Sequence, residues 1–267
     1  MNKKFLITTL IIASVILILS LGSVSAKNAD DSQDQLLPEQ EGTYNVKGRP
    51  DLKLKVFVHN PKPENQYAKP APAPSPVCNL QDPDSATTIG DAGWHLPDGT
   101  WIYVLNTSSV PSTVGASNLA IMATDAFNRW SAATGNRVVF ARDASNTTIT
   151  RATLDTKNII TWGRTSGTAL GVTYIWYDRF TSVVSEVDTI MNNKFSWSWS
   201  NPTGNCAFLN TYDAQNILTH ELGHWMGMND FYTADYQNAT MYGYGAKAEI
   251  KKDTLSTGDI SGIGLIY

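Results

Sequence analysis

The chain is 267 residues long, carries a formal net charge of -4 at pH 7, and contains 42% hydrophobic and 16% charged residues. This weak negative charge, without any run of basic residues, argues against a nucleic-acid partner. The length allows one globular domain preceded by a region of different composition.

The first 26 residues have the organisation of a secretory signal peptide. Lys3 and Lys4 precede an apolar run over residues 5–21, and small residues at 24–26 offer a cleavage site. We therefore expect residues 1–26 to be removed, and the mature protein to be extracellular and free of the membrane. The alternative is an uncleaved anchor that keeps both lysines on the cytoplasmic side.

Residues 27–83 do not have the composition of a core. Acidic residues come first, and prolines alternate with small residues over 69–76. Proline fixes φ and removes a backbone donor, so this run predicts an extended spacer. Apolar residues alternate from Leu52 to Val58, and only residues 52–59 are expected to form a strand. The segment is interpreted as a pro-region or a Pro-rich linker.

Residues 84–267 have a globular composition and are expected to form one α+β domain. Apolar residues recur at helical spacing between Ser117 and Thr134, and Gly135 follows, which predicts a helix with one buried face. Strand-like runs are more numerous and indicate a mixed, mostly parallel sheet. They lie at residues 100–105, 137–141, 158–162, 168–177 and 183–191.

The stretch from residue 220 to 230 has the spacing of a zinc site. On a helix that starts near Thr211 or Asp213, His220 and His224 lie one above the other and can bind one metal ion. Glu221 lies beside that ion, where its carboxylate can accept a proton from a bound water. Gly227 ends the helix and lets the chain turn back, so that Asp230 becomes the third ligand. The alternative is a buried helix face on which carbonyl groups cap both histidines.

The pattern His-Glu-x-x-His-x-x-Gly-x-x-Asp resembles the long zinc-binding motif of the metzincin metallopeptidases, with the aspartate that snapalysin-type members have. Residues 239–243, which include Met241, resemble the methionine turn that forms an apolar floor under the metal in that family. The strand, helix and strand between 100 and 141 and the closing segment 255–263 resemble the matrixin branch.

This resemblance implies a metzincin-like catalytic domain over residues 84–267. Its fold would be a twisted mixed sheet with two long helices and a small C-terminal subdomain. An edge strand would bind the peptide substrate as an added strand, and Gly171 to Tyr177 is the candidate for it. An ordinary interior strand is the alternative for this segment.

The function expected from these residues is that of a secreted zinc-dependent endopeptidase acting on polypeptides, as a monomer. Zn2+ bound by His220, His224 and Asp230 would activate a water, with Glu221 as the general base and Gly227 and Met241 in supporting roles. Structural Ca2+ stays open as an additional ion.

Two other functions stay open. One is a thermolysin-like peptidase with Glu249 as the third zinc ligand, and the other is a secreted binding or adhesion module that keeps a metal without turnover. A second zinc ion is not expected, because His59 and His95 lie far apart in the sequence.

The two cysteines, Cys78 and Cys206, are expected to pair in an exported chain. The alternative, implied by the matrixin resemblance, is that the thiolate of Cys78 occupies the open zinc position as a zymogen switch.

Overall fold

The structure is a computed structural model and describes residues 37–63, 76–165, 167–199 and 205–267. The expected signal peptide lies outside the described residues, as does most of the Pro-rich run. Within the described ranges, no helix is long and apolar enough to cross a membrane.

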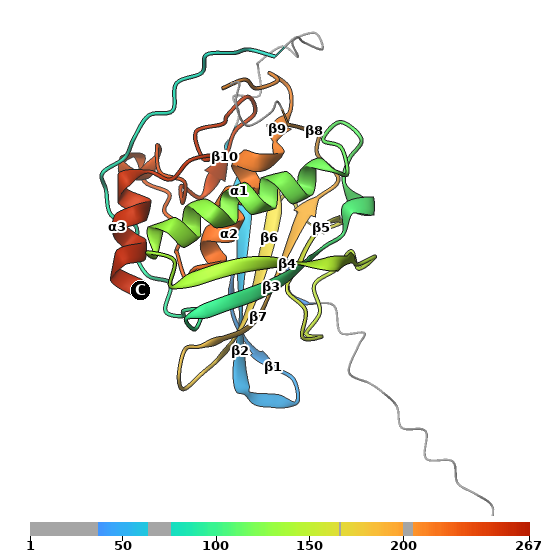
Figure 1. Ribbon diagram of the computed structural model, residues 1–267, viewed down its shortest axis with the longest axis vertical. Coiled ribbons are helices and arrows are strands. Elements are labelled where there is room, and N and C mark those ends of the chain that lie inside the picture. The colour runs from blue at the N-terminus through green and yellow to red at the C-terminus, as the bar shows by residue number, and fades with distance from the viewer. Residues whose placement is uncertain (1–36, 64–75, 166, 200–204) are drawn as a thin grey trace, which may run out of the picture. The chain divides into compact units, whose positions relative to one another are not determined.

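A mixed, mostly parallel sheet forms the centre of the compact unit Leu36–Tyr267 (Figure 1). The strand order is β1-β2-β6-β7-β5-β3-β4, and β10 pairs with β2. Strands β7, β5, β3 and β4 run parallel to one another, whereas the pairs β1–β2, β2–β6 and β6–β7 are antiparallel and β10 runs parallel to β2. The strands are β1 (Gly42–Val46), β2 (Arg49–Pro61), β3 (Gly99–Leu105), β4 (Val138–Asn146), β5 (Ile159–Gly163), β6 (Gly171–Asp178), β7 (Val184–Asn192) and β10 (Tyr244–Gly245).

The described residues contain three α-helices: α1 (Asn118–Ala133), α2 (Ala214–Trp225) and α3 (Thr257–Ile266). Figure 1 shows α1 and α2 side by side on one face of the sheet, and the main core lies between these helices and the strands. A second apolar cluster covers the β2 and β6 region with Leu54, Val56, Val172 and Trp176. Short elements complete the chain: η1 (Thr107–Ser109), β8 (Trp197–Ser198), β9 (Tyr212–Asp213) and η2 (Ala234–Tyr236).

Most of the expected elements are confirmed. The helix expected at 117–134 is α1, and the six apolar residues of its predicted face are at most 2% exposed: Leu119, Met122, Ala123, Ala126, Phe127 and Trp130. The strands expected between 100 and 191 correspond to β3 to β7. The α+β class and the mixed sheet are confirmed as well. After α2 the chain forms η2, β10 and α3, with loops between them.

Two expectations about how the sheet is built are wrong. Strands β1 and β2 come from the segment placed before the domain, yet they are part of the main sheet, so the fold has no boundary at Asp84. The segment Gly171 to Tyr177 is not an edge strand, because β6 pairs with β7 on one side and β2 on the other. The same observation explains both errors: the sheet partner of β6 is a strand from more than a hundred residues earlier in the chain.

The predicted disulfide between Cys78 and Cys206 is present, with 128 residues of sequence separation. The zymogen switch based on the thiolate of Cys78 is therefore wrong. In the chain-entropy model, a loop of this length stabilises the folded state by about 5 kcal/mol. Val77 also pairs with Ala207 through backbone hydrogen bonds, so both sides of the loop are held together at this point.

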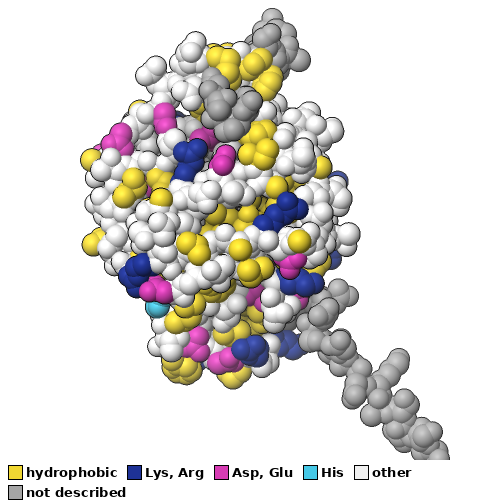
Figure 2. Space-filling model, viewed as in Figure 1, with side chains coloured by type: hydrophobic (Ala, Val, Ile, Leu, Met, Phe, Trp, Pro, Cys, Tyr) yellow, Lys and Arg dark blue, Asp and Glu magenta, His cyan; other side chains and the backbone are white. Residues whose placement is uncertain are grey.

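On the face drawn in Figure 2, Lys and Arg side chains are interspersed with Asp and Glu side chains. They do not gather into one area of a single sign. This distribution agrees with the small net charge of -4.

Candidate metal centre

Helix α2 carries the motif through the middle of the molecule. Its N-cap is Asp213, as expected, and the Asp213 carboxylate accepts hydrogen bonds from the backbone N–H groups of Gln215 and Asn216 at 2.9 and 3.0 Å. All twelve residues of α2 are buried. His220 and His224 therefore lie at a position where water does not reach their side chains.

Backbone carbonyls fix the orientation of both imidazoles. His220 Nδ1 lies 2.7 Å from Thr240 O, and His224 Nδ1 lies 2.9 Å from Met228 O. A carbonyl oxygen only accepts, so each Nδ1 carries the proton and each Nε2 keeps a free lone pair. Burial lowers the pKa of His220 well below its usual value and that of His224 to about 3, which keeps both rings neutral.

Asp230 meets the two histidines after the turn at Gly227. Its Oδ1 lies 3.1 Å from His220 Nε2 and 3.6 Å from His224 Nε2. None of these three atoms has a hydrogen-bond partner among the described residues. Tyr232 OH lies 3.3 Å from the other carboxylate oxygen, Oδ2, and donates to it.

These three atoms fit a zinc ion. Two neutral imidazoles with Nε2 lone pairs and one carboxylate oxygen are acceptors only, so their approach needs a proton or a cation between them. Ligands at about 2.0–2.1 Å from a tetrahedral zinc lie roughly 3.3 Å apart, which is close to the two separations observed. The donor set of nitrogen and oxygen also suits zinc, and both Nδ1 atoms have the carbonyl partners usual for metal-bound histidine.

Glu221 lies beside this group, and a chain of hydrogen bonds holds one of its oxygens. Trp225 Nε1 can only donate, and it donates to Thr189 Oγ1 at 2.9 Å. Thr189 then donates to Thr173 Oγ1 at 2.8 Å, and Thr173 donates to Glu221 Oε2 at 2.5 Å. The other oxygen, Oε1, has no partner among the described residues. Burial raises the Glu221 pKa to about 8, and a divalent cation nearby would favour the ionised form.

The turn that contains Met241 packs against helix α2. A Cβ added to Gly223 would lie 2.3 Å from Met241 Sδ, so the methionine packs against the helix turn between the two histidines. The carboxylate of Asp259, in the capping box of α3, accepts hydrogen bonds from the backbone N–H groups of Thr240 and Met241. Asp259 thereby holds the Thr240 carbonyl in place for His220. The Ser256-x-x-Asp259 spacing predicts the start of a helix, but it does not indicate that Asp259 also holds this turn.

Glu249 is not part of this centre. Among the residues that the structure describes, the groups able to hold a metal are His220, His224 and Asp230, and His59, His220 and Glu221. The Glu249 carboxylate instead lies 3.5 Å from Lys251 Nζ, and its side chain is 13% exposed.

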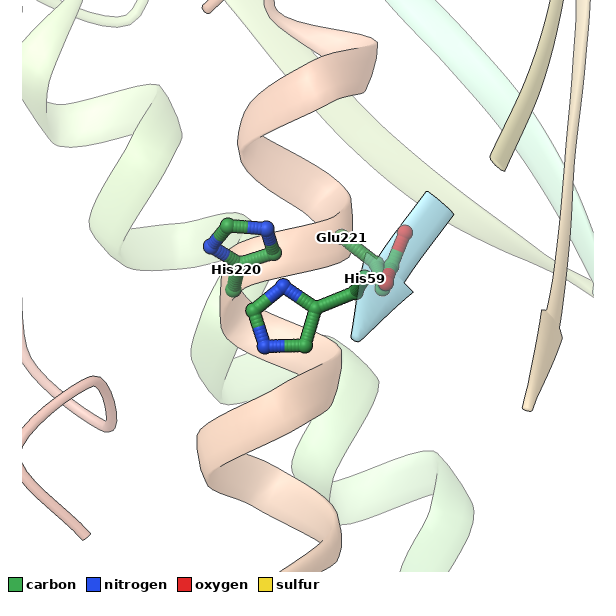
Figure 3. Close-up of side chains that lie close together, drawn as sticks. All are labelled: His59, His220 and Glu221. Atoms are coloured by element: carbon green, nitrogen blue, oxygen red, sulfur yellow. The ribbon is translucent and has the colours of Figure 1, made fainter. Parts of the chain in front are cut away.

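Strand β2 contributes residues that the sequence did not connect with the site. His59 is fully buried with its ring centroid 3.9 Å from that of His220, and Figure 3 shows it beside His220 and Glu221. Phe57 stacks flat on His224 at 3.7 Å. Lys252 Nζ lies 3.3 Å from His59 Nε2 and donates to the carbonyl of Tyr244. Alternation over 52–58 predicted only the strand and not its partners.

No family model matches the chain, and no curated protein matches it.

Gly227 is expected to be needed both for the turn and for close packing. Its φ is +86°, and a Cβ there would lie 2.3 Å from Trp94 O. A residue other than glycine costs about 1–2 kcal/mol in the left-handed conformation. Gly227→Ala should lower the free energy of unfolding by more than this, because Trp94 O blocks the new methyl group. The measurement is denaturant unfolding of the full chain.

Gly93→Ala is the matched control, since Gly93 also has a positive φ, +98°, but open space around a new Cβ. Equal losses in the two variants would show that the contact with Trp94 contributes nothing.

Proposed function

We propose that this chain is a secreted zinc-dependent endopeptidase with a metzincin-like catalytic domain. The observation that supports this most directly is the convergence of two imidazole nitrogens and one carboxylate oxygen, from His220, His224 and Asp230, with no partner among the described residues. The succession β3, α1, β4 also agrees with the strand, helix and strand on which the resemblance to the matrixin branch rests.

Zinc at this centre would polarise the scissile carbonyl and lower the pKa of a bound water. Glu221 is the residue of this chain that can move the proton. Its Oε2 is held by Thr173, whereas Oε1 is free to accept a proton and to return it to the leaving amine. His220 and His224 keep their orientation through Thr240 and Met228, so the ligand set is organised in advance.

Metal analysis and a cleavage assay together test this function. The purified chain should contain about one zinc ion. Because His220, Glu221 and His224 are buried in the intact chain, limited proteolysis should be needed to yield a form that cleaves an unfolded protein. Chelator should abolish this cleavage, and added zinc should restore it. Bound zinc without any chelator-sensitive cleavage would favour the binding or adhesion module. Absence of zinc would remove both functions.

A further inference from the structure

Strand β2 occupies the position where an extended peptide would reach the metal centre. It pairs with β6 in antiparallel register over eight residue pairs, from Leu52 opposite Asp178 to His59 opposite Gly171. On its other side, Asn60 and Pro61 pair in parallel with β10, which follows the turn at Met241. Figure 1 shows β2 in blue beside the yellow β6. One strand is thus hydrogen-bonded to the sheet and to the C-terminal part of the chain, directly over helix α2.

The two faces of β2 have different partners. Leu54, Val56 and Val58 belong to the second apolar cluster together with residues of β6. Phe57 and His59 are on the opposite face, where they cover His224 and His220. Side chains on a strand alternate between its faces, so the same thirteen-residue strand anchors itself on one side and closes the site on the other.

This cover leaves no route for a substrate. His220, Glu221 and His224 are 0% exposed, and Asp230 is 7% exposed. A peptidase must bring a polypeptide backbone to its metal, so the fold with β2 in place is closed to substrate. Without β2, β6 would be the edge of the sheet, with unpaired backbone groups beside Glu221, and such an edge can bind an extended peptide of many sequences.

We propose that β2 is a built-in inhibitory strand, which fills the peptide-binding edge of β6 and places His59 at the metal centre. This inference rests on the proposed peptidase function. His59 reaches the centre because His59, His220 and Glu221 present ligand-type atoms within 4.8 Å of one another, and His59 Nδ1 has no partner among the described residues.

The hydrogen bonds of β2 explain why it inhibits the site and is not itself a substrate. The His59 carbonyl accepts a hydrogen bond from the backbone N–H of Leu170 at 2.7 Å. That carbonyl is therefore engaged at the sheet edge, and the imidazole, not a peptide bond, lies next to Glu221 (Figure 3). The disulfide between Cys78 and Cys206 ties the chain that follows to the rest of the domain. A cut between Pro63 and Val77 would therefore end the covalent link between the segment that carries the β1–β2 hairpin and the rest of the domain.

The test uses the full chain with the recognition sequence of a site-specific protease placed within residues 64–75. The rate at which excess chelator extracts zinc is measured before the cut, and again after the cut and removal of the hairpin by gel filtration. Extraction should become at least about tenfold faster, a change of the size produced by losing a partner of a metal site. Cleavage of a fluorogenic extended peptide should appear at the same step, and a synthetic peptide of residues 49–61 should reverse both effects.

The outcomes separate the inhibitory strand from the peptidase function. Unchanged extraction after the hairpin is gone would overturn the inhibitory strand. So would peptide cleavage by the uncut chain at the rate of the cut one, although the peptidase function would then stand. Faster extraction without any peptide cleavage would keep the closed site and remove the peptidase function.

A pair of point variants in the uncut chain gives a second measurement that needs no removal of the hairpin. His59→Ala should accelerate zinc extraction, because it opens the space over His220. Val58→Ala is the matched control, since it shortens a neighbouring side chain of β2 on the face away from the metal ligands. Equal rates for the two variants would overturn the role given to His59.

Discussion

Replacing Asp230 with alanine is expected to weaken zinc binding by more than about a hundredfold, because changes that only touch a ligand's partner already cost 10–100-fold. The variant leaves two imidazoles at the site and removes the only charge among the three converging groups. Competition with a chromophoric chelator on the full chain measures the affinity. Circular dichroism of the metal-free variant shows whether the fold is kept.

Two further variants make this result specific. Asp230→Asn keeps the shape and the hydrogen-bond acceptor but loses the charge, so its zinc affinity should fall between those of the original chain and Asp230→Ala. Glu249→Ala should leave the affinity nearly unchanged, since Glu249 pairs with Lys251 and belongs to neither group of ligand-type residues. A strong loss in Glu249→Ala together with no loss in Asp230→Ala would replace the proposed ligands with the thermolysin-like set.

The parts of this molecule that local chemistry determines could be predicted from the sequence. Helix α1 follows from its apolar spacing, and α2 begins at Asp213 because a short carboxylate caps free backbone amides. The approach of Asp230 to His220 follows from a glycine that can adopt a positive φ at residue 227. Each of these features depends on residues within about one or two turns of helix.

Features that depend on distant contacts could not be predicted in the same way. The partner of β6 is β2, and nothing in the sequence around Gly171 specifies a strand from the N-terminal segment. His59 likewise follows an alternating apolar pattern that predicts a strand but does not show that its second face is also buried. Thr173 is an ordinary strand residue in the sequence, and only its position opposite Glu221 gives it a function.

The burial of the metal centre under β2 also determines how the proposed role of Glu221 should be tested. If β2 inhibits the proposed peptidase, any peptide cleavage by the intact chain depends on the release of β2 as well as on the chemical step. Variants of Glu221 should therefore be compared after the cut within residues 64–75 and removal of the hairpin. Zinc content is then determined on the same samples, so that a loss of metal cannot be mistaken for a loss of the base.

Under these conditions Glu221→Gln should reduce kcat/KM by at least about a hundredfold, the lower end of the range for general base catalysis, with zinc content unchanged. Glutamine keeps the length of the side chain and can still accept the Thr173 hydrogen bond, but it cannot take up a proton. Thr173→Val keeps Glu221 and removes only the donor that orients it, so its turnover should fall less than that of Glu221→Gln. Turnover of Glu221→Gln close to that of the original chain would assign the base to another residue, and a larger loss in Thr173→Val would give the threonine a more direct part than holding Glu221 Oε2.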